Sequence, residues 1–149
     1  MRLRVHLAFC IAVSLAAGAG LVAQKGITEE ELDKHMKRAQ PAMGAAMKAL
    51  QANNAAEASK QLAIVRQVMF DTQGFWVTHK KDDAVKANKE TIAKIEATEK
   101  LLAGPSPDVP GAMAAMKQEV GAACRSCHEN YRVRDADNNW VLKPGSIAN

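Results

Sequence analysis

The sequence predicts an all-α fold, an antiparallel up-down-up-down bundle of four helices. Apolar residues recur at spacings of three and four in four segments of about 20 to 25 residues, which is the period of an amphipathic helix. Short connections separate these segments: Asn53-Asn54, the basic residues 79–81, and a stretch rich in Pro and Gly at 104–111. No stretch alternates as a strand would. Helices joined by short connections favour antiparallel neighbours.

The first 23 residues have the layout of a secretory signal peptide. Arg2 and Arg4 supply the positive start, residues 5–15 form the apolar run, and mostly small residues occupy positions 16–23. The apolar run is shorter than the roughly 20 residues of a transmembrane helix. We therefore expect cleavage after Ala23, with Ala19 as the second choice, export of the remainder, and no membrane-spanning segment after cleavage.

Charge argues against a nucleic-acid partner. The formal net charge of the 149 residues is +4, and the lysines are spread along the chain. Binding to a polyanion usually requires basic residues clustered on one face. We expect no nucleic-acid partner.

The first helix is expected from about Thr28 to Asn53. Thr28 and Glu31 have the spacing of a capping box. An apolar stripe follows, made of Leu32, Met36, Ala39, Met43, Ala46 or Met47, and Leu50. Pro41 lies inside the segment, and because it has no N–H to donate, we expect a kink or a local break there.

The second helix is expected from Asn54, as its N-cap, to about Thr78. Its stripe consists of Ala58, Leu62, Val65, Met69, Thr72 and Trp76. Asp82 is the expected N-cap of the third helix, which ends near Gly104. The inward positions of the third helix are Val85, Ile92, Ile95 and Leu102.

The fourth helix is expected from about Pro110 to Arg134. One face carries Met113, Met116, Val120, Cys124, Cys127 and Tyr131. These helices define a domain of residues 24–134. Residues 135–149 form a C-terminal tail with turn-forming residues, which either packs back on the helices or is mobile.

A five-residue motif in the fourth helix predicts a covalent cofactor. Cys124 and Cys127, followed at once by His128, have the spacing that attachment of c-type haem requires. Each thiol adds across a vinyl group of the porphyrin, and the imidazole binds the iron. On a helix, all three side chains fall within about 100° of one face. The sequence therefore predicts one haem c, held inside the bundle.

Two other interpretations of the cysteines have less support. A redox dithiol of the thioredoxin type opens a helix after a strand, and a structural zinc needs two more Cys or His ligands nearby. Neither setting is present. A thiol oxidoreductase using Cys124 and Cys127 remains an alternative, and it predicts a colourless protein. We find no second group of acid, base or nucleophile and expect no enzyme activity.

The chain resembles the class II c-type cytochromes, the family of cytochrome c′ and its low-spin relatives. The resemblance rests on the motif Cys124–His128 near the end of the last helix, with Tyr131 and Arg132 after it. Weaker similarities are Lys-His-Met-Lys in the first helix and Phe-Trp at the end of the second. The chain departs from the family by its tail.

The resemblance implies a protein exported to the periplasm, often dimeric, with His128 as the proximal iron ligand. Family members divide by the group opposite. A methionine from the first helix gives a six-coordinate electron carrier, whereas a non-ligating side chain gives a five-coordinate site that binds small gases. Export suits this chemistry, because c-type haem is attached outside the cytoplasm in bacteria.

Met36 is the candidate for the sixth ligand. In an antiparallel four-helix order the first helix neighbours the fourth, so Met36 near the start of one matches the level of His128 near the end of the other. His35 lies about 100° off the stripe and is interpreted as a surface histidine. The other methionines are expected to fill the core: Met43, Met47, Met69 and Met113.

The leading functional prediction is a periplasmic cytochrome that carries single electrons, with His128 and Met36 as axial ligands and periplasmic redox proteins as partners. Tyr131 is expected to pack against the porphyrin. The alternative is a five-coordinate protein that binds NO or CO. A homodimer is possible in either case.

Overall fold

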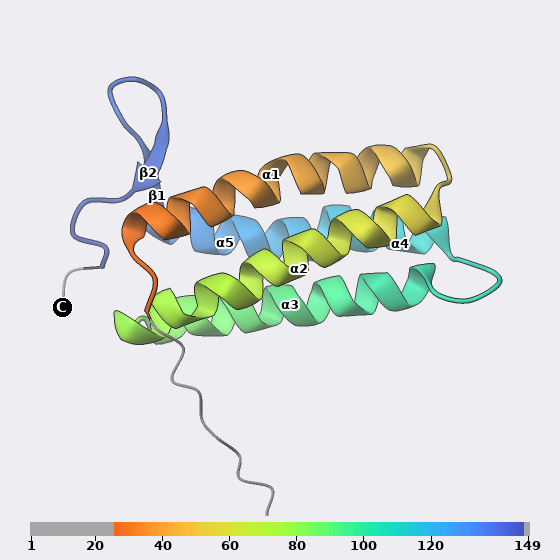
Figure 1. Cartoon of the computed structure of the whole chain (residues 1–149), viewed down its shortest axis with the longest axis horizontal. Coiled ribbons are helices and arrows are strands. Elements are labelled where there is room, and N and C mark those ends of the chain that lie inside the picture. Colours follow the sequence, from red (N-terminus) through yellow and green to blue (C-terminus); the bar gives the residue numbers. More distant parts are fainter. Residues whose placement is uncertain (1–25, 148–149) are drawn as a thin grey trace, which may run out of the picture.

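The computed structural model describes residues 26–147, most of which lie in helices (Figure 1). The predicted signal peptide and Cys10 lie outside these residues. In chain order the elements are α1 (Glu29–Gln51), α2 (Ala55–Thr78), α3 (Asp82–Leu102), α4 (Val109–Ala115), the π-helix η1 (Met116–Val120), α5 (Gly121–Tyr131), β1 (Arg132–Arg134) and β2 (Trp140–Leu142). The predicted all-α fold is confirmed for the described residues, apart from one small hairpin.

Side-chain caps begin three of the helices. Thr28 and Glu31 form the predicted capping box, with N···O distances of 2.7 and 3.2 Å. Asn54 caps α2 by accepting the backbone N–H of Glu57 at 3.0 Å, as predicted, and Asp108 caps α4 in the same way. The expected N-cap of α3 is wrong by one residue: Lys81 holds that position, its side chain does not cap the helix, and Asp82 is the first helical residue.

Pro41 does not break α1, which continues through it as one helix of 23 residues. Buried residues lie on both sides of the proline, among them Leu32, Ala39, Ala42 and Ala46. Packing of this face stabilises the helix beyond what local propensity provides. The predicted local break is therefore absent.

The predicted fourth helix contains a π segment and ends three residues early. The residues at the joints of α4, η1 and α5 all have right-handed helical torsion angles, so the helical path is continuous. Arg132 is extended, with φ −120° and ψ 146°, and it begins β1. The cysteine motif thus lies in α5, one turn before the hairpin.

The hairpin joins the end of the expected domain to the expected tail, because β1 lies before residue 135 and β2 after it. β1 and β2 are antiparallel, and Arg132 pairs with Leu142, Val133 with Val141 and Arg134 with Trp140. Asp135 holds the turn by accepting the N–H groups of Asp137 and Asn139 at 3.0 and 2.7 Å. The expectation of no strands is wrong here.

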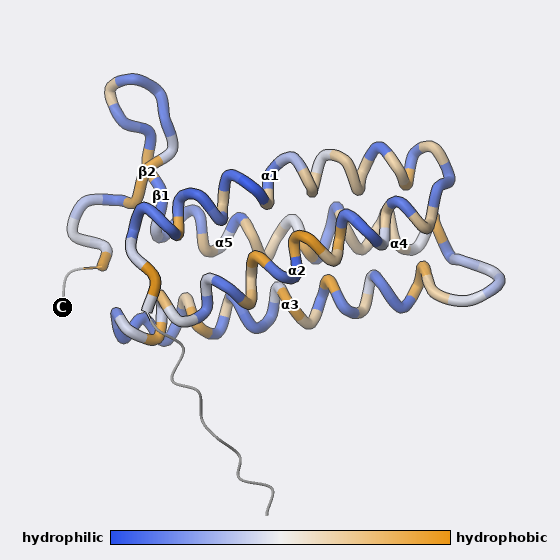
Figure 2. Tube along the Cα trace, viewed as in Figure 1, coloured by the Kyte–Doolittle hydropathy of each residue, from blue (hydrophilic) through white to orange (hydrophobic). Residues whose placement is uncertain are grey.

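Apolar side chains form two clusters between the helices. α1 packs on α2 and α4, α2 packs on α3, and α3 packs on α4, η1 and α5. Figure 2 shows the most hydrophobic part of α2 in the middle of that helix. All six predicted stripe residues of α2 are buried. The larger cluster includes Ala46, Leu50, Leu62, Val65, Met69, Ile95, Met116 and Val120. The smaller cluster consists of Leu32, Phe75, Trp76, Ala84 and Tyr131.

Among the helices of residues 26–147, none combines the length and the apolar character that a membrane span requires.

Candidate functional site

A cleft of about 800 Å³ is lined by residues of α1, α2, α3, α5 and the hairpin. Its lining includes all five predicted site residues: Met36, Cys124, Cys127, His128 and Tyr131. The volume is within the roughly 300–1,000 Å³ of small-molecule and cofactor pockets. Exposed residues such as Glu29 and Gln40 also line the cleft, so it opens to solvent.

The cleft lies where the two apolar clusters meet. Cys124 packs against the larger cluster and Cys127 against the smaller one, while Met36 packs against both. Cys124, Cys127 and His128 lie within about one turn of α5 and therefore reach the cleft together. Met36 comes from α1. The structure thus brings together side chains that are 88 to 92 positions apart in the printed sequence.

Both thiols are free and half-buried. Burial raises the pKa of Cys127 to about 11, and the neighbouring Cys124 and Asp83 add to the shift. Burial also raises the pKa of Cys124, although the charge of Arg125 opposes this. Reactive dithiols have a depressed thiol pKa. These environments therefore do not favour a thiol oxidoreductase.

His128 is half-buried beside Arg132. The guanidinium Nη1 of Arg132 lies 3.2 Å from Nδ1 and 3.3 Å from Nε2 of the imidazole. Burial, and then the charge of Arg132, lower the pKa of His128 to about 4. The imidazole is therefore neutral at pH 7, which is the form that binds a metal.

Tyr131 forms part of the cleft wall and is held from two sides. Its hydroxyl donates to Oδ1 of Asp83 at 2.6 Å, and its ring centre lies 4.9 Å from that of Trp76. Burial raises the pKa of Tyr131, and the hydrogen bond and charge of Asp83 raise it further. Its position is compatible with the predicted contact to a macrocycle.

Replacing Tyr131 with Phe should lower the free energy of unfolding by about 1 kcal/mol at neutral pH, because it removes the bond to Asp83. In the unfolded chain the phenol has its ordinary pKa of 10.0, whereas in the folded protein the pKa is raised. Above pH 10 the unfolded state therefore loses this proton first, and the free energy of unfolding of the wild type falls. Urea unfolding at about pH 7 and pH 11 measures both effects. Asp83→Asn, which keeps an acceptor but no charge, is the control. The role of Tyr131 would be contradicted if Tyr131→Phe were as stable as the wild type at about pH 7 and lost as much stability as the wild type between about pH 7 and pH 11.

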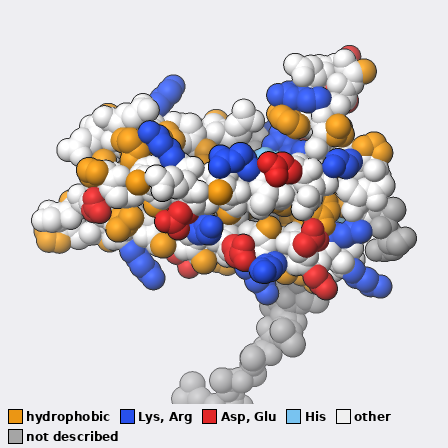
Figure 3. Space-filling view, turned by 180° about the vertical axis from the view of Figure 1, so that it is seen from behind, with side chains coloured by type: hydrophobic (Ala, Val, Ile, Leu, Met, Phe, Trp, Pro, Cys, Tyr) orange, Lys and Arg blue, Asp and Glu red, His pale blue; other side chains and the backbone are white. Residues whose placement is uncertain are grey.

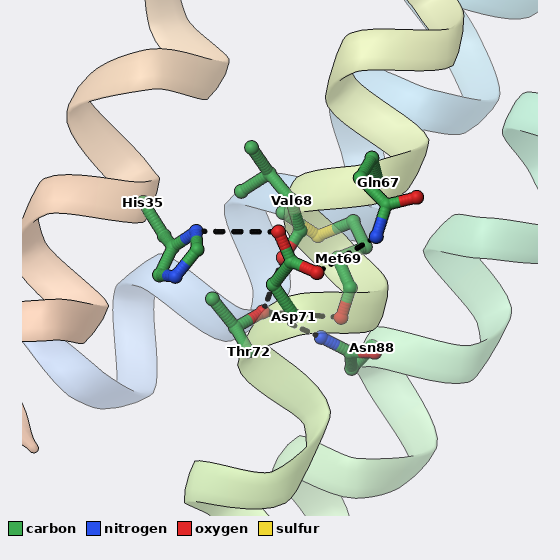
Figure 4. Close-up of polar contacts among 7 residues, drawn as sticks. All are labelled: His35, Gln67, Val68, Met69, Asp71, Thr72 and Asn88. Atoms are coloured by element: carbon green, nitrogen blue, oxygen red, sulfur yellow. Dashed lines mark hydrogen bonds and ion pairs between the residues drawn. The ribbon is translucent and has the colours of Figure 1, made fainter. Parts of the chain in front are cut away.

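His35 is not the surface histidine that the sequence predicts. Its side chain is 22% exposed, and Nδ1 lies 3.5 Å from Oδ2 of Asp71 on α2 (Figure 4). Gln67 donates to the other oxygen of Asp71 at 2.7 Å. His35 is not among the residues that line the cleft. This placement leaves Met36 as the α1 side chain suited to a ligand role.

The four methionines that were expected to fill the core separate into two groups. Met43, Met47 and Met113 pack against the larger cluster and do not line the cleft, as expected of core residues. Met69 is 8% exposed and belongs to the same cluster, but it also lines the cleft. A signal was present in the sequence, because Met69 lies two turns before Trp76, another lining residue, on the same stripe.

The hairpin supplies cleft residues that sequence reasoning missed. Arg134, Asn138 and Trp140 line the cleft together with Arg132. The guanidinium carbons of Arg132 and Arg134 lie 4.3 and 4.0 Å from the ring centre of Trp140. This geometry is that of a cation–π contact. Three-residue strands are too short for the alternation that predicts a strand from sequence.

The residues of the cleft fit a haem better than a metal ion held by side chains alone. Within residues 26–147, no three His, Cys, Asp or Glu side chains are grouped so that they could hold an ion. A structural zinc site requires four such ligands. A haem iron takes only axial ligands from the protein, and His128 and Met36 supply suitable types. Two free thiols in the same cleft match its covalent attachment.

Charges are mixed on the face opposite to that of Figure 1. Figure 3 shows Lys and Arg side chains interspersed with Asp and Glu among the described residues in view. The even spread agrees with the spacing of lysines in the sequence.

The support for a cofactor site therefore comes from this chain's own residues and their placement. Comparison of the chain with protein families, with curated proteins and with solved structures gives no match.

Proposed function

We propose that this protein is a c-type cytochrome of the class II kind, an antiparallel up-down-up-down four-helix bundle with one covalently bound haem. Cys124 and Cys127 attach the macrocycle, and His128 and Met36 bind the iron. The observation that supports the proposal is the cleft of about 800 Å³, which is lined by all four of these side chains. The proposed function is the transfer of single electrons in the periplasm.

The two thiols suit the attachment reaction. In each addition the S–H bond breaks, sulfur bonds to one vinyl carbon and the proton goes to the other, so no oxidant is consumed. Cys124 and Cys127 are free, as this reaction requires. Because they are three positions apart on one helix, both reach the same macrocycle.

The axial side chains complete the proposed site. Bound haem supplies the one-electron chemistry, as its iron alternates between the ferric and ferrous states. His128 offers a neutral imidazole, and Met36 offers a thioether, which raises the reduction potential. Arg132 has donors only, so it must leave Nε2 of His128 before that nitrogen binds iron.

The alternative is a five-coordinate protein that binds NO or CO. It is favoured by the open cleft, because exposed lining residues such as Glu29 leave a path for a small gas. The two functions differ in whether Met36 occupies the sixth position.

A redox titration tests the proposed function. The exported, purified protein should give one reversible transition with the slope of a single electron, followed by visible absorbance, and CO should not change it. The same chain without residues 1–23, produced in the cytoplasm, is the control and should stay colourless. No reversible transition would contradict electron transfer, and a large effect of CO would favour gas binding.

A further inference from the structure

One face of the hairpin is turned toward the cleft. Side chains two apart on a strand share a face, and so do directly paired residues. The register therefore places Arg132, Arg134, Trp140 and Leu142 on the same face. Leu142 packs against the smaller apolar cluster, and all four residues line the cleft. The two guanidiniums are thus held at the cleft and not on the outer side of the hairpin.

The two guanidiniums lack an acidic partner. Within the described part of the chain, no carboxylate lies within ion-pair distance of Arg132 or Arg134. Four acids also line the cleft: Glu29, Glu30, Asp33 and Asp135. None is ion-paired with these guanidiniums, although the charge of Asp33 opposes the lowering of the pKa of Arg132. Glu30 pairs with Lys34 at 2.6 Å. Asp33 pairs with Lys37 at 2.6 Å, and Asp135 accepts the backbone N–H groups of its own turn.

Trp140 fixes both cations beside each other. Their guanidinium carbons lie within 4.3 Å of the centre of its ring. Arg132 is half-buried, whereas Arg134 and Trp140 are exposed. The two neighbouring positive charges repel each other, and a bound anion would offset that repulsion. The guanidinium presents a planar fork of N–H donors, which matches both oxygens of a carboxylate.

We propose that Arg132, Arg134 and Trp140 form a carboxylate-binding site at the mouth of the cleft, and that it binds the two propionate groups of the haem. The identity of the ligand rests on the proposed function, whereas the carboxylate site itself rests on the hairpin alone. Arg132 must leave the imidazole of His128 when iron binds there, and the ring of Trp140 then keeps it beside an anion. The tail thereby gains a role in orienting the cofactor.

Binding of iron mesoporphyrin to the full chain without attached haem tests the site. Its ethyl groups cannot react with the thiols, and its dimethyl ester has no free carboxylates. Arg134→Gln should weaken binding of the diacid roughly tenfold, as expected for a lost charge-assisted pair, and leave the ester unchanged. Arg38→Gln, the same charge change at an exposed position of α1 outside the cleft, should affect neither.

A second variant and a competition experiment distinguish the possible results. Trp140→Leu should weaken the diacid selectively too, because it frees both guanidiniums. Succinate that competes with the diacid in the wild type but not in Arg134→Gln would support the carboxylate site for free acids as well. Equal effects of Arg134→Gln on diacid and ester, or no effect on either ligand, would overturn the proposal. Circular dichroism checks that each variant keeps its helices.

A failure of the proposed haem function can be distinguished from a failure of the carboxylate site. If neither porphyrin binds the wild type, the haem proposal is contradicted. The carboxylate site is then tested by titrating the protein with succinate and measuring tryptophan fluorescence. Succinate binding that requires Arg134 would uphold the site, and absence of such binding would overturn it.

Discussion

Replacing both Cys124 and Cys127 with Ser should abolish covalent attachment of haem to the exported protein. The hydroxyl is a far weaker nucleophile than the thiol and does not form the thioether. Both sulfurs line one cleft and are unbridged, so we expect each to carry one bond. Haem staining of the denatured protein and its intact mass measure the attachment.

The matched control is Ser126→Ala, inside the same motif. Ser126 is exposed, and its hydroxyl donates to the carbonyl of Ala123 at 2.9 Å, not toward a thiol. This variant should keep the mass of one haem. Each single Cys variant should keep at most one thioether. Haem that stays covalently bound in the double variant would contradict the assignment.

Replacing Met36 with Ala should change the iron from low spin to high spin and let CO bind. The change removes the thioether proposed as sixth ligand and leaves the His128 side intact. Electron paramagnetic resonance of the ferric protein and CO binding to the ferrous protein measure the two effects. Low-spin iron that does not bind CO would contradict ligation by Met36.

Two further methionine variants sharpen this result. Met43→Ala is the control, because Met43 is also half-buried on α1 but does not line the cleft. We expect no change of spin state there. Met69 lines the cleft from α2 and is the other thioether within it. A spin change in Met69→Ala but not in Met36→Ala would transfer the ligand role to Met69.

The helices and their buried faces were predictable from sequence because local rules determine them. The spacing of Thr28 and Glu31 predicts a capping box, and the 3.6-residue period predicts the buried side of α2. Met36 and His128 line the same cleft, which agrees with the expectation drawn from an antiparallel order of the helices. These features depend on residues near one another or on a simple topology.

The features that sequence reasoning missed depend on tertiary contacts. The π segment before α5 adds no signature to the apolar stripe, and the hairpin strands are only three residues long. His35 is half-buried because α2 brings Asp71 to it, which the period of α1 alone does not reveal. The pairing of Arg134 with Trp140 likewise required the register of the hairpin.

The visible absorption spectrum of the exported protein, oxidised and reduced, with and without CO, tests the central claim most directly. We predict the spectrum of a low-spin haem, with a charge-transfer band from methionine to ferric iron and no response to CO. A high-spin spectrum that CO shifts would contradict ligation by Met36 and favour the gas-binding alternative. Absence of haem absorption would contradict the assignment as a cytochrome.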